Sequence, residues 1–374
     1  MKHDFSHLIL HLSLIEKVGP SQIQRLLEHI NTYEPEQWYR FNQSDFKNIF
    51  GITEHSAQLI VSGLANHYYL DQELIYIEKN SINWMTILDS DYPHLLKEIH
   101  LPPPIMYWKG SLPRGTNHLA VVGSRNANQY GYEAIKKITA PLVQQGWGII
   151  SGGALGIDAK AHQVALDHSG FTVAVLGSGL LNLYPRENLT LFEKIIQNGG
   201  GIVSTFPLLM DALPGNFPAR NRIISGFSRG CLVVQAAIKS GARITADYCL
   251  TQGKEVFAVP GPFDSQLSAG CHALIGQGAK ITTSAQDILS EFGHEFKPIF
   301  KEEKPHILPL FDTPKGAPGD PPEQAIIKAC GAPSSLDELV EQTGIPLIEL
   351  THLLFNLQIK GKICQNMAGL LQKP

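Results

Sequence analysis

Four short stretches of the 374-residue sequence combine glycine with serine, two of them with arginine, in ways suited to binding phosphate. The longest is SGGALGID at residues 151–158, which follows an apolar segment at 147–150 and precedes a helical pattern. Glycines let the backbone approach a ligand closely, and the start of a helix points free N–H groups at it. The turn therefore predicts an anion site, with a tight turn that binds nothing as the alternative. Its candidate residues are Ser151, Gly152, Gly153 and Gly156.

The other three stretches also follow apolar segments that are typical of buried strands. They are GSR at 123–125, GSG at 177–179 and SGARIT at 240–245. Ligands of open α/β sheets lie beyond the carboxyl ends of the strands, so four such ends favour a ligand site over four unrelated turns. The guanidinium of Arg125 suits a phosphate on a chain or on a mononucleotide. The further candidates here are Gly123, Ser124, Ser240, Gly241 and Thr245.

A fifth stretch, FPARNR at 217–222, places one aromatic ring and two arginines within six residues. A base stacked on an aromatic ring, with arginine on the phosphates, is typical of single-stranded nucleic-acid binding, where stacking contributes about 1–3 kcal/mol per base. Phe217, Arg220, Asn221 and Arg222 are therefore candidates. Alternatively, both arginines pair with carboxylates nearby and the phenylalanine belongs to the core.

The sequence lacks the usual patterns of a nucleotide-dependent enzyme. It has no G-x-x-x-x-G-K-[ST], which argues against a P-loop nucleotidase, and its first turn is not G-x-G-x-x-G, which argues against a dinucleotide site. Asp158 and His162 lie four residues apart and could pair for catalysis, but such a pair more often orders its loop. No Ser-His-Asp group, metal cluster or paired carboxylates can be identified, so we expect no catalytic residue, metal or cofactor.

Composition points to a cytoplasmic globular protein with a substantial core. Hydrophobic residues make up 43% and charged residues 17% of the chain, and no apolar run approaches the roughly 20 residues of a membrane span. Five scattered cysteines without a C-x-x-C fit a reducing compartment. The net charge of −4 is unevenly spread: residues 115–290 carry 13 basic against 10 acidic side chains, and residues 1–75 carry 5 against 9. A polyanion site is therefore expected in the middle of the chain.

The candidate residues must be positioned by the alternating strand and helix patterns of residues 118–290. Short, continuously apolar segments predict strands buried on both faces, and helical patterns lie between most of them. The alternation predicts an α/β fold, an extended Rossmann-like, doubly wound and mostly parallel sheet with right-handed crossovers. The predicted strands are 119–122, 148–150, 172–176, 201–204, 231–235, 255–259 and 280–282, preceded by 84–88 and 105–108.

Smaller domains are expected on both sides of the sheet domain, which spans residues 76–293. Residues 1–75 predict short helices joined by turn glycines, a helix-hairpin-helix or SAM-like domain whose acidic balance favours a structural or protein-contact role. Seven prolines indicate a linker at 294–322. Residues 323–374 predict three helices and a hairpin, which is typical of a winged helix. The outward side chains of its third helix are not basic, which favours protein contact over DNA reading.

Together the motifs resemble those of the DNA-processing protein DprA (Smf) family over about residues 80–290. In chain order the resemblance covers DYP at 91–93, PP at 102–103, the GSR turn, the SGGALGID turn with His162, YP at 184–185, FPARNR, SGARITA from residue 240, VPG at 259–261 and GCHALI at 270–275. The flanking helical and winged-helix segments match the three-part layout of that family.

This resemblance implies a non-enzymatic protein that binds single-stranded DNA, protects it and loads RecA recombinase onto it during natural transformation. It implies phosphate contacts from Arg125 and the strand-end glycines, and a basic surface extended by Lys239 and Arg243. It also implies a homodimer formed through the sheet domain, with a contact near Leu274 and Ile275.

Three positions depart from the family pattern. Leu155 stands where arginine or lysine is usual, and Thr205 and Gln235 stand where glutamate is frequent. The first departure removes one expected phosphate contact, and the other two remove candidate catalytic acids. Two alternatives stay open: a nucleotide phosphoribohydrolase-like enzyme on the same fold, which would need such acids, and a protein-interaction module that has lost DNA binding.

Overall fold

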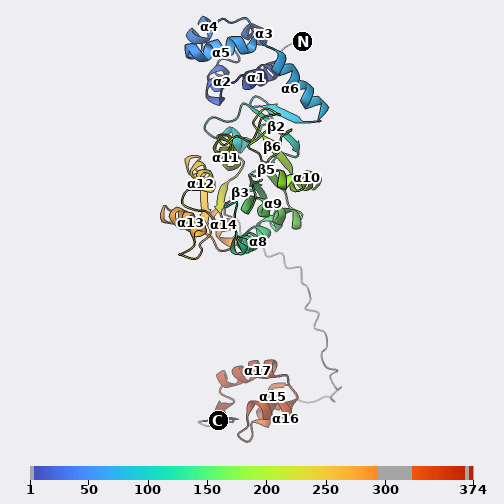
Figure 1. Cartoon of the computed structure of the whole chain (residues 1–374). Helices are drawn as coiled ribbons and strands as arrows, with labels where there is room; N and C mark the ends of the chain where they lie inside the picture. Colours follow the sequence, from blue (N-terminus) through green and yellow to red (C-terminus); the bar gives the residue numbers. More distant parts are fainter. Residues whose placement is uncertain (1–3, 294–321, 367–369, 374) are drawn as a thin grey trace. The chain divides into compact units, whose positions relative to one another are not determined.

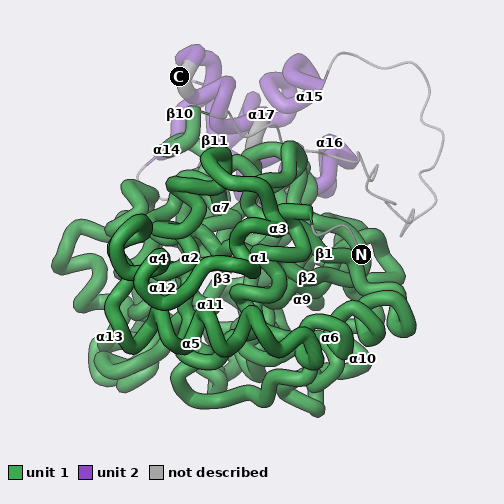
Figure 2. Tube along the Cα trace, turned by 90° about the horizontal axis from the view of Figure 1, so that it is seen from above, with its two compact units in different colours: residues 1–299 green, residues 300–374 purple. Residues whose placement is uncertain are grey.

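The computed structural model describes residues 4–293, 322–366 and 370–373. They belong to two compact units, residues 1–299 and residues 300–374, each with its own hydrophobic core (Figure 1, Figure 2). No helix within the described residues is long and apolar enough to cross a membrane.

The first unit begins with six helices, of which the first five surround an aromatic core. Trp38, Phe46 and Phe50 are buried there, and the rings of Trp38 and Phe50 stack with their centroids 4.8 Å apart. The domain boundary expected at residue 75 falls inside the sixth helix, whose Leu70 packs in one cluster with residues of the sheet. The helices are α1 (Phe5–Leu14), α2 (Pro20–Leu27), α3 (Pro35–Trp38), α4 (Gln43–Asn48), α5 (Glu54–Leu64) and α6 (Tyr68–Lys79).

A nine-stranded sheet forms the centre of this unit, in the order β1-β2-β6-β5-β4-β3-β7-β8-β9. The strands from β6 to β9 in that order are parallel, and β1 and β2 extend the sheet through antiparallel pairings. The doubly wound, mostly parallel sheet is thus confirmed, and every predicted strand is present with ends shifted by at most two residues. The strands are β1 (Asn83–Thr86), β2 (Ile105–Gly110), β3 (His118–Val122), β4 (Gly148–Ser151), β5 (Thr172–Val175), β6 (Gly201–Ser204), β7 (Gly230–Val233), β8 (Glu255–Ala258) and β9 (Lys280–Ile281).

Successive residues of the central strands enter two different cores, as strands covered on both faces must. In β3, Leu119 and Val121 pack with α8, α9 and α14, whereas Ala120 and Val122 pack with α7, α11, α12 and α13. Helices therefore cover both faces of the sheet (Figure 1). These elements are α7 (His94–Lys97), α8 (Gln129–Gln144), α9 (Ile157–Asp167), the 3-10 helix η1 (Arg186–Asn188), α10 (Leu189–Gln197), α11 (Asn216–Gly226), α12 (Gly241–Thr251), α13 (Gln266–Gly276) and α14 (Ala285–Glu291).

The strand order reverses beside β3. Along the chain, β4, β5 and β6 are added on one side of β3, and β7, β8 and β9 are added on the other. The helices α8 and α12, which come after β3 and β7, consequently pack on opposite faces of the sheet. This arrangement opens a crevice at the carboxyl ends of β3 and β7, the place where ligands of doubly wound sheets bind.

The second unit combines three helices with a two-stranded hairpin, as the sequence predicted. A capping box begins its middle helix: the hydroxyl of Ser335 accepts the N–H of Glu338, and the Glu338 carboxylate accepts the N–H of Ser335 at 2.8 Å. The linker expected at 294–322 lies outside the described residues except for Pro322, where the first helix begins. The elements are α15 (Pro322–Ala329), α16 (Leu336–Thr343), α17 (Leu347–Ile359), β10 (Cys364–Gln365) and β11 (Leu371–Gln372).

Candidate functional site

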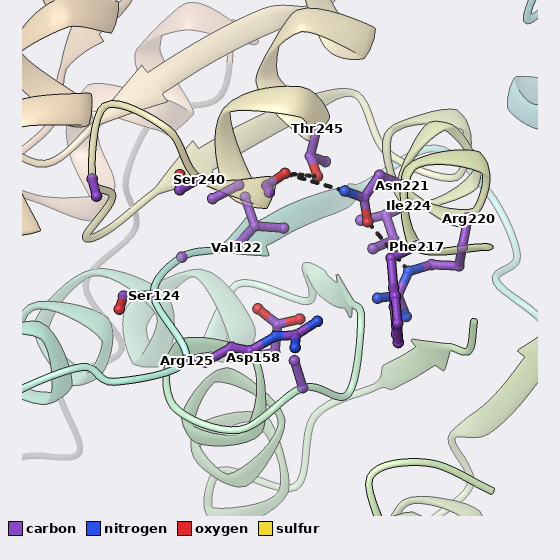
Figure 3. Close-up of a pocket in the computed structure, with 15 residues that line it drawn as sticks. Val122, Ser124, Arg125, Asp158, Phe217, Arg220, Asn221, Ile224, Ser240 and Thr245 are labelled. Carbon is purple, nitrogen blue, oxygen red and sulfur yellow. Dashed lines mark hydrogen bonds between the residues drawn. The ribbon is translucent and has the colours of Figure 1, made fainter. Parts of the chain in front are cut away.

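A pocket of about 240 Å³ opens at the carboxyl ends of β3 and β7, where the strand order reverses. Its lining comes from the turn after β3, the start of α9, the helix α11 and the start of α12 (Figure 3). The sequence-predicted residues that line it are Gly123, Ser124, Arg125, Phe217, Arg220, Asn221, Ser240, Gly241 and Thr245.

The turn after β3 is anchored through both backbone polar groups of Ser124. The N–H of Ser124 donates to the carbonyl of Gln235 at 2.7 Å, and the carbonyl of Ser124 accepts the N–H of Ile157 at 3.1 Å. Glycine is needed at position 123 because a Cβ on Gly123 would come within 2.9 Å of the Gln235 carbonyl. This anchoring leaves the side chain of Arg125 to extend along the pocket (Figure 3).

The glycine-rich turn after β4 supports this arrangement from inside the fold. Gly156 has a φ of 77°, and a Cβ there would collide with the backbone oxygens of Ser124 and Arg125. The N–H of Gly152 donates to the carboxylate of Asp158 at 3.0 Å. That N–H therefore already has an acceptor within the protein, and the turn acts by positioning the residues around it.

The other candidates of this turn are also engaged by the protein itself. The hydroxyl of Ser151 donates to the carbonyl of Val121 at 2.6 Å, and the carbonyl of Gly153 accepts a hydrogen bond from Asn188 at 2.9 Å. Both residues are buried. Contrary to the expectation of direct ligand contacts, Ser151, Gly152, Gly153 and Gly156 are not among the residues that line the pocket, because this turn packs against neighbouring strands and loops.

Two buried charges of opposite sign line the inner wall of the pocket. The exposed fractions of Asp158 and Arg220 are 6% and 5%. The Arg220 guanidinium donates to the carbonyls of Gly152, at 2.6 Å, and Val175. Burial raises the pKa of Asp158 to about 6 against the lowering effect of Arg220, and burial lowers the pKa of Arg220 to about 10. Since these two charges offset each other, Arg125 supplies the net positive charge of the pocket lining.

The ring of Phe217 lies close to both arginines of the pocket. The guanidinium carbon of Arg125 is 5.1 Å from the ring centroid, and that of Arg220 is 5.9 Å away. Both distances are in the range of a cation–π interaction. An aromatic face beside a guanidinium can stack on a nucleobase while the cation contacts the adjoining phosphate.

The start of α12 presents hydrogen-bond donors to the pocket. Ser240 precedes the helix without capping it, which leaves first-turn N–H groups available for an anion. The Ser240 hydroxyl is sealed from solvent and has no hydrogen-bond partner within the described part of the chain. A buried polar group left unpaired costs about 1–3 kcal/mol, so a ligand with acceptor oxygens would relieve an existing penalty.

Arg222 does not belong to the pocket, in contrast to the expectation from the FPARNR stretch. It follows Arg220 by two residues on α11, and residues at that spacing point to different sides of a helix. Its guanidinium donates to the backbone carbonyls of His100 and Leu101, and burial lowers its pKa. Arg222 thus joins α11 to a neighbouring loop.

The remaining candidates also lie outside the pocket lining. Lys239 is exposed on the loop before α12, and Arg243 donates to the carbonyl of Ile238 in that loop at 2.9 Å. Of the two expected dimer contacts, Leu274 is buried in the core of the unit and Ile275 is partly buried.

Asp158 is the charged lining residue that the sequence indicated only as a possible catalytic partner of His162. It lies in the first turn of α9, where its carboxylate can accept N–H groups of the preceding turn. An acidic residue at the start of a predicted helix was the sequence signal for this role. The possible partner His162 instead has its Nδ1 2.7 Å from the hydroxyl of Thr172, and burial lowers its pKa to about 3. His162 is thus engaged by Thr172, and no hydrogen bond joins it to Asp158 among the described residues.

Sequence comparisons connect both units to known families. The family described as DNA recombination-mediator protein A matches residues 83–293, and a DprA winged helix domain matches residues 312–369. The chain is 34% identical to Protein Smf of Synechocystis, over 94% of this chain and 95% of that protein. It is 38% identical to the DNA processing protein DprA of Streptococcus pneumoniae, over 61% of this chain and 81% of that protein.

Solved structures also resemble the chain, among them those of two DNA processing proteins. DNA processing protein A from Streptococcus pneumoniae matches with a TM-score of 0.67 and 33% identity, over 79% of this chain and 100% of that chain. DNA processing protein A from Helicobacter pylori, described for its single-stranded DNA binding mode, matches with a TM-score of 0.50 and 26% identity, over 56% of this chain and 95% of that chain. The winged-helix match agrees with the three helices and hairpin of the second unit.

Proposed function

Because the chain belongs to the DNA recombination-mediator protein A family, we propose that it binds single-stranded DNA in the pocket at the carboxyl ends of β3 and β7. Bound DNA is protected there and handed to the recombinase RecA, as natural transformation requires of incoming strands. The single-stranded DNA binding described for the relative from Helicobacter pylori supports this choice of ligand.

The convergence of Arg125, Phe217 and Ser240 on one pocket carries the proposal. A backbone phosphate accepts hydrogen bonds from the Arg125 guanidinium and from the first N–H groups of α12. The unpartnered hydroxyl of Ser240, which is covered in this structure, adds a third when its side chain rotates toward the phosphate. The adjoining base stacks on Phe217. Bases of a duplex are already paired and stacked, so the aromatic contact favours single strands.

The same residues support binding without hydrolysis. Asp158, the carboxylate of the pocket lining, already accepts the N–H of Gly152 and balances the charge of Arg220. Gln235 stands at one of the positions where a nucleotide hydrolase would need an acid, and its amide donates to the side chain of Asn128 at 2.7 Å. We therefore infer that DNA leaves the pocket chemically unchanged.

We further propose a cytoplasmic homodimer formed at the β9 edge of the sheet. Ile281 on β9 is largely exposed, and Ile275 on the preceding α13 is partly exposed, so a second copy could cover both and protect the open strand edge. The five cysteines are free thiols, as a reducing compartment favours. Sedimentation of Ile281→Asp should give monomers where the unaltered chain gives dimers, and an unchanged mass would contradict this interface.

The direct test of the function replaces Arg125 with alanine and measures binding to a labelled single strand and a duplex at several salt concentrations. Single-strand affinity should fall roughly 10- to 100-fold, the loss of a charged hydrogen bond of about 1.5–3 kcal/mol. The slope of log affinity against log salt should fall by roughly 0.7, the value for one phosphate contact on a single strand. Arg40→Ala removes an exposed arginine outside the pocket and should change neither quantity. Unchanged single-strand binding by Arg125→Ala would contradict the proposal.

The handover to RecA needs a separate measurement. Single strands coated with a single-strand-binding protein should support RecA filament assembly faster when the unaltered chain is added. Arg125→Ala should lose this acceleration in proportion to its loss of DNA affinity. Acceleration that persists without DNA binding would assign the effect to another surface.

A further inference from the structure

A narrow apolar hollow lies beside the phosphate pocket and shares Arg125 and Phe217 with it. Its other walls are formed by Leu155 from the turn after β4, and by Tyr184 and Pro185 from the segment after β5. We call this hollow the stacking slot. We propose that a second unpaired nucleobase of the bound strand stacks across the slot against Tyr184. The inference rests on the proposed function, because it assigns the base that neighbours the phosphate at Arg125.

The slot displays large apolar side chains that the fold leaves uncovered. The exposed fraction is 44% for Tyr184 and 40% for Leu155. The centroid of the Tyr184 ring is 6.0 Å from that of Phe217, with 55° between the ring planes. Single exposed apolar residues are ordinary, but two that flank an aromatic ring and share an arginine make a platform for a flat aromatic ligand.

The chemistry of the walls favours a base over a phosphate. Apolar side chains form most of the slot, and the arginine that is buried behind it, Arg220, already donates to two backbone carbonyls. The slot has a volume of about 40 Å³, little more than one water molecule occupies in the liquid. A base is therefore not enclosed but lies across the mouth with one face on Tyr184. Every base has such a face, so the contact is tolerant of sequence.

The position of the slot connects it to the bound strand. Arg125 lines both the pocket and the slot, so a phosphate held at its guanidinium brings the next base of the same strand to Tyr184. A base within a duplex cannot reach the slot, because it is stacked and paired. The slot thus raises affinity for single strands through bases, independently of salt, whereas Arg125 acts through charge.

This difference can be measured with two strands of equal length, oligo-dT and a strand of abasic nucleotides that keeps the phosphates. Tyr184→Ala should weaken binding of oligo-dT roughly tenfold, as the loss of one stacked base does. It should leave binding of the abasic strand and the salt slope unchanged. Tyr184→Phe keeps the ring and should bind both strands as the unaltered chain does. Arg125→Ala should weaken binding of both strands.

The outcomes separate the slot from the proposed function. Equal losses on both strands for Tyr184→Ala, or no loss on oligo-dT, would overturn the slot. Unchanged binding of both strands by Arg125→Ala would overturn the phosphate pocket instead. A spectroscopic measurement guards against misfolding: at saturating protein, 2-aminopurine within oligo-dT should be quenched less by Tyr184→Ala than by the unaltered chain, and equal quenching would also overturn the slot. Leu155→Ala, at an exposed turn position, should reduce oligo-dT binding by a smaller factor and spare the abasic strand.

Discussion

The two units of this chain both have folds that other proteins use to bind DNA, yet they present different chemistry. The pocket of the first unit brings together Arg125, Phe217 and the start of α12. In the second unit the exposed side of α17, which is the third helix of the winged helix, carries Glu349 and Asn356. The third helix reads DNA in some winged helices, but an acid there repels phosphates. The comparison teaches that exposed side chains, and not the fold, are the basis on which we propose DNA binding for the first unit.

The largest effect is expected from a substitution at Gly156, where the backbone beside the pocket is tightly packed. The comparable glycine of the second unit, Gly344, has open space around it. Gly156→Val places a Cβ against the oxygens of Ser124 and Arg125 at a φ of 77°, so we expect a loss of about 3 kcal/mol or more in the free energy of unfolding. Gly344 has a φ of 67° but no atoms within 4 Å, so Gly344→Ala should cost only about 1 kcal/mol. Chemical denaturation of both variants tests the contrast, and similar losses would contradict it.

One carboxylate in each unit should contribute to the pH dependence of stability with opposite sign. Burial raises the pKa of Asp158 to about 6, so the folded first unit holds this proton more tightly than the unfolded chain does. The resulting stability is complete below the ordinary pKa of 3.8 and is lost as pH rises through about 6, a change of about 1–3 kcal/mol. Denaturation of the unaltered chain and of Asp158→Asn between pH 4 and 7 isolates this contribution, because the unaltered chain should lose stability relative to the variant as pH rises through about 6. Parallel curves would argue against a raised pKa.

Glu338 in the second unit provides the contrast, because its pKa is shifted in the opposite direction to that of Asp158. Hydrogen bonds from the backbone and side chain of Ser335 lower the pKa of Glu338, so its contribution to stability is present above the ordinary value of 4.5 and is lost as pH falls. Ser335→Ala removes the capping hydroxyl and should reduce the stability of the second unit by about 1 kcal/mol, measured by thermal unfolding. Single-strand binding should be unaffected, and a loss of binding would assign DNA contact to this unit.

The smallest expected effect comes from removing the second unit altogether. A chain that ends at residue 293 keeps every residue of the pocket and the stacking slot, and its cores do not include the second unit. Its affinity for a single strand should stay within about twofold of the full chain, because no pocket phosphate contact is lost. Fluorescence anisotropy with the same labelled strand provides the measurement. A tenfold loss would mean that the winged helix contributes to DNA binding, against the comparison drawn above.

Local sequence patterns predicted the elements well, because strand and helix formation depend mainly on short-range periodicity. Buried parallel strands appear as short apolar runs, and the capping box at Ser335 and Glu338 identifies a helix start without further context. The doubly wound order placed the carboxyl ends of several strands on one edge, so Arg125, Ser240 and Phe217 were correctly expected near one another.

What the sequence determined by itself was thus the succession of elements and the edge of the sheet where a ligand would bind. Only the tertiary structure decided which polar groups remain free for that ligand. Arg220 and Arg222 are the same residue type in the same short motif, so the sequence does not tell them apart. Helical geometry turns Arg220 toward the pocket wall and Arg222 toward a loop. Whether a hydroxyl such as that of Ser240 lacks a partner depends on atoms brought from distant parts of the chain, which no local pattern encodes.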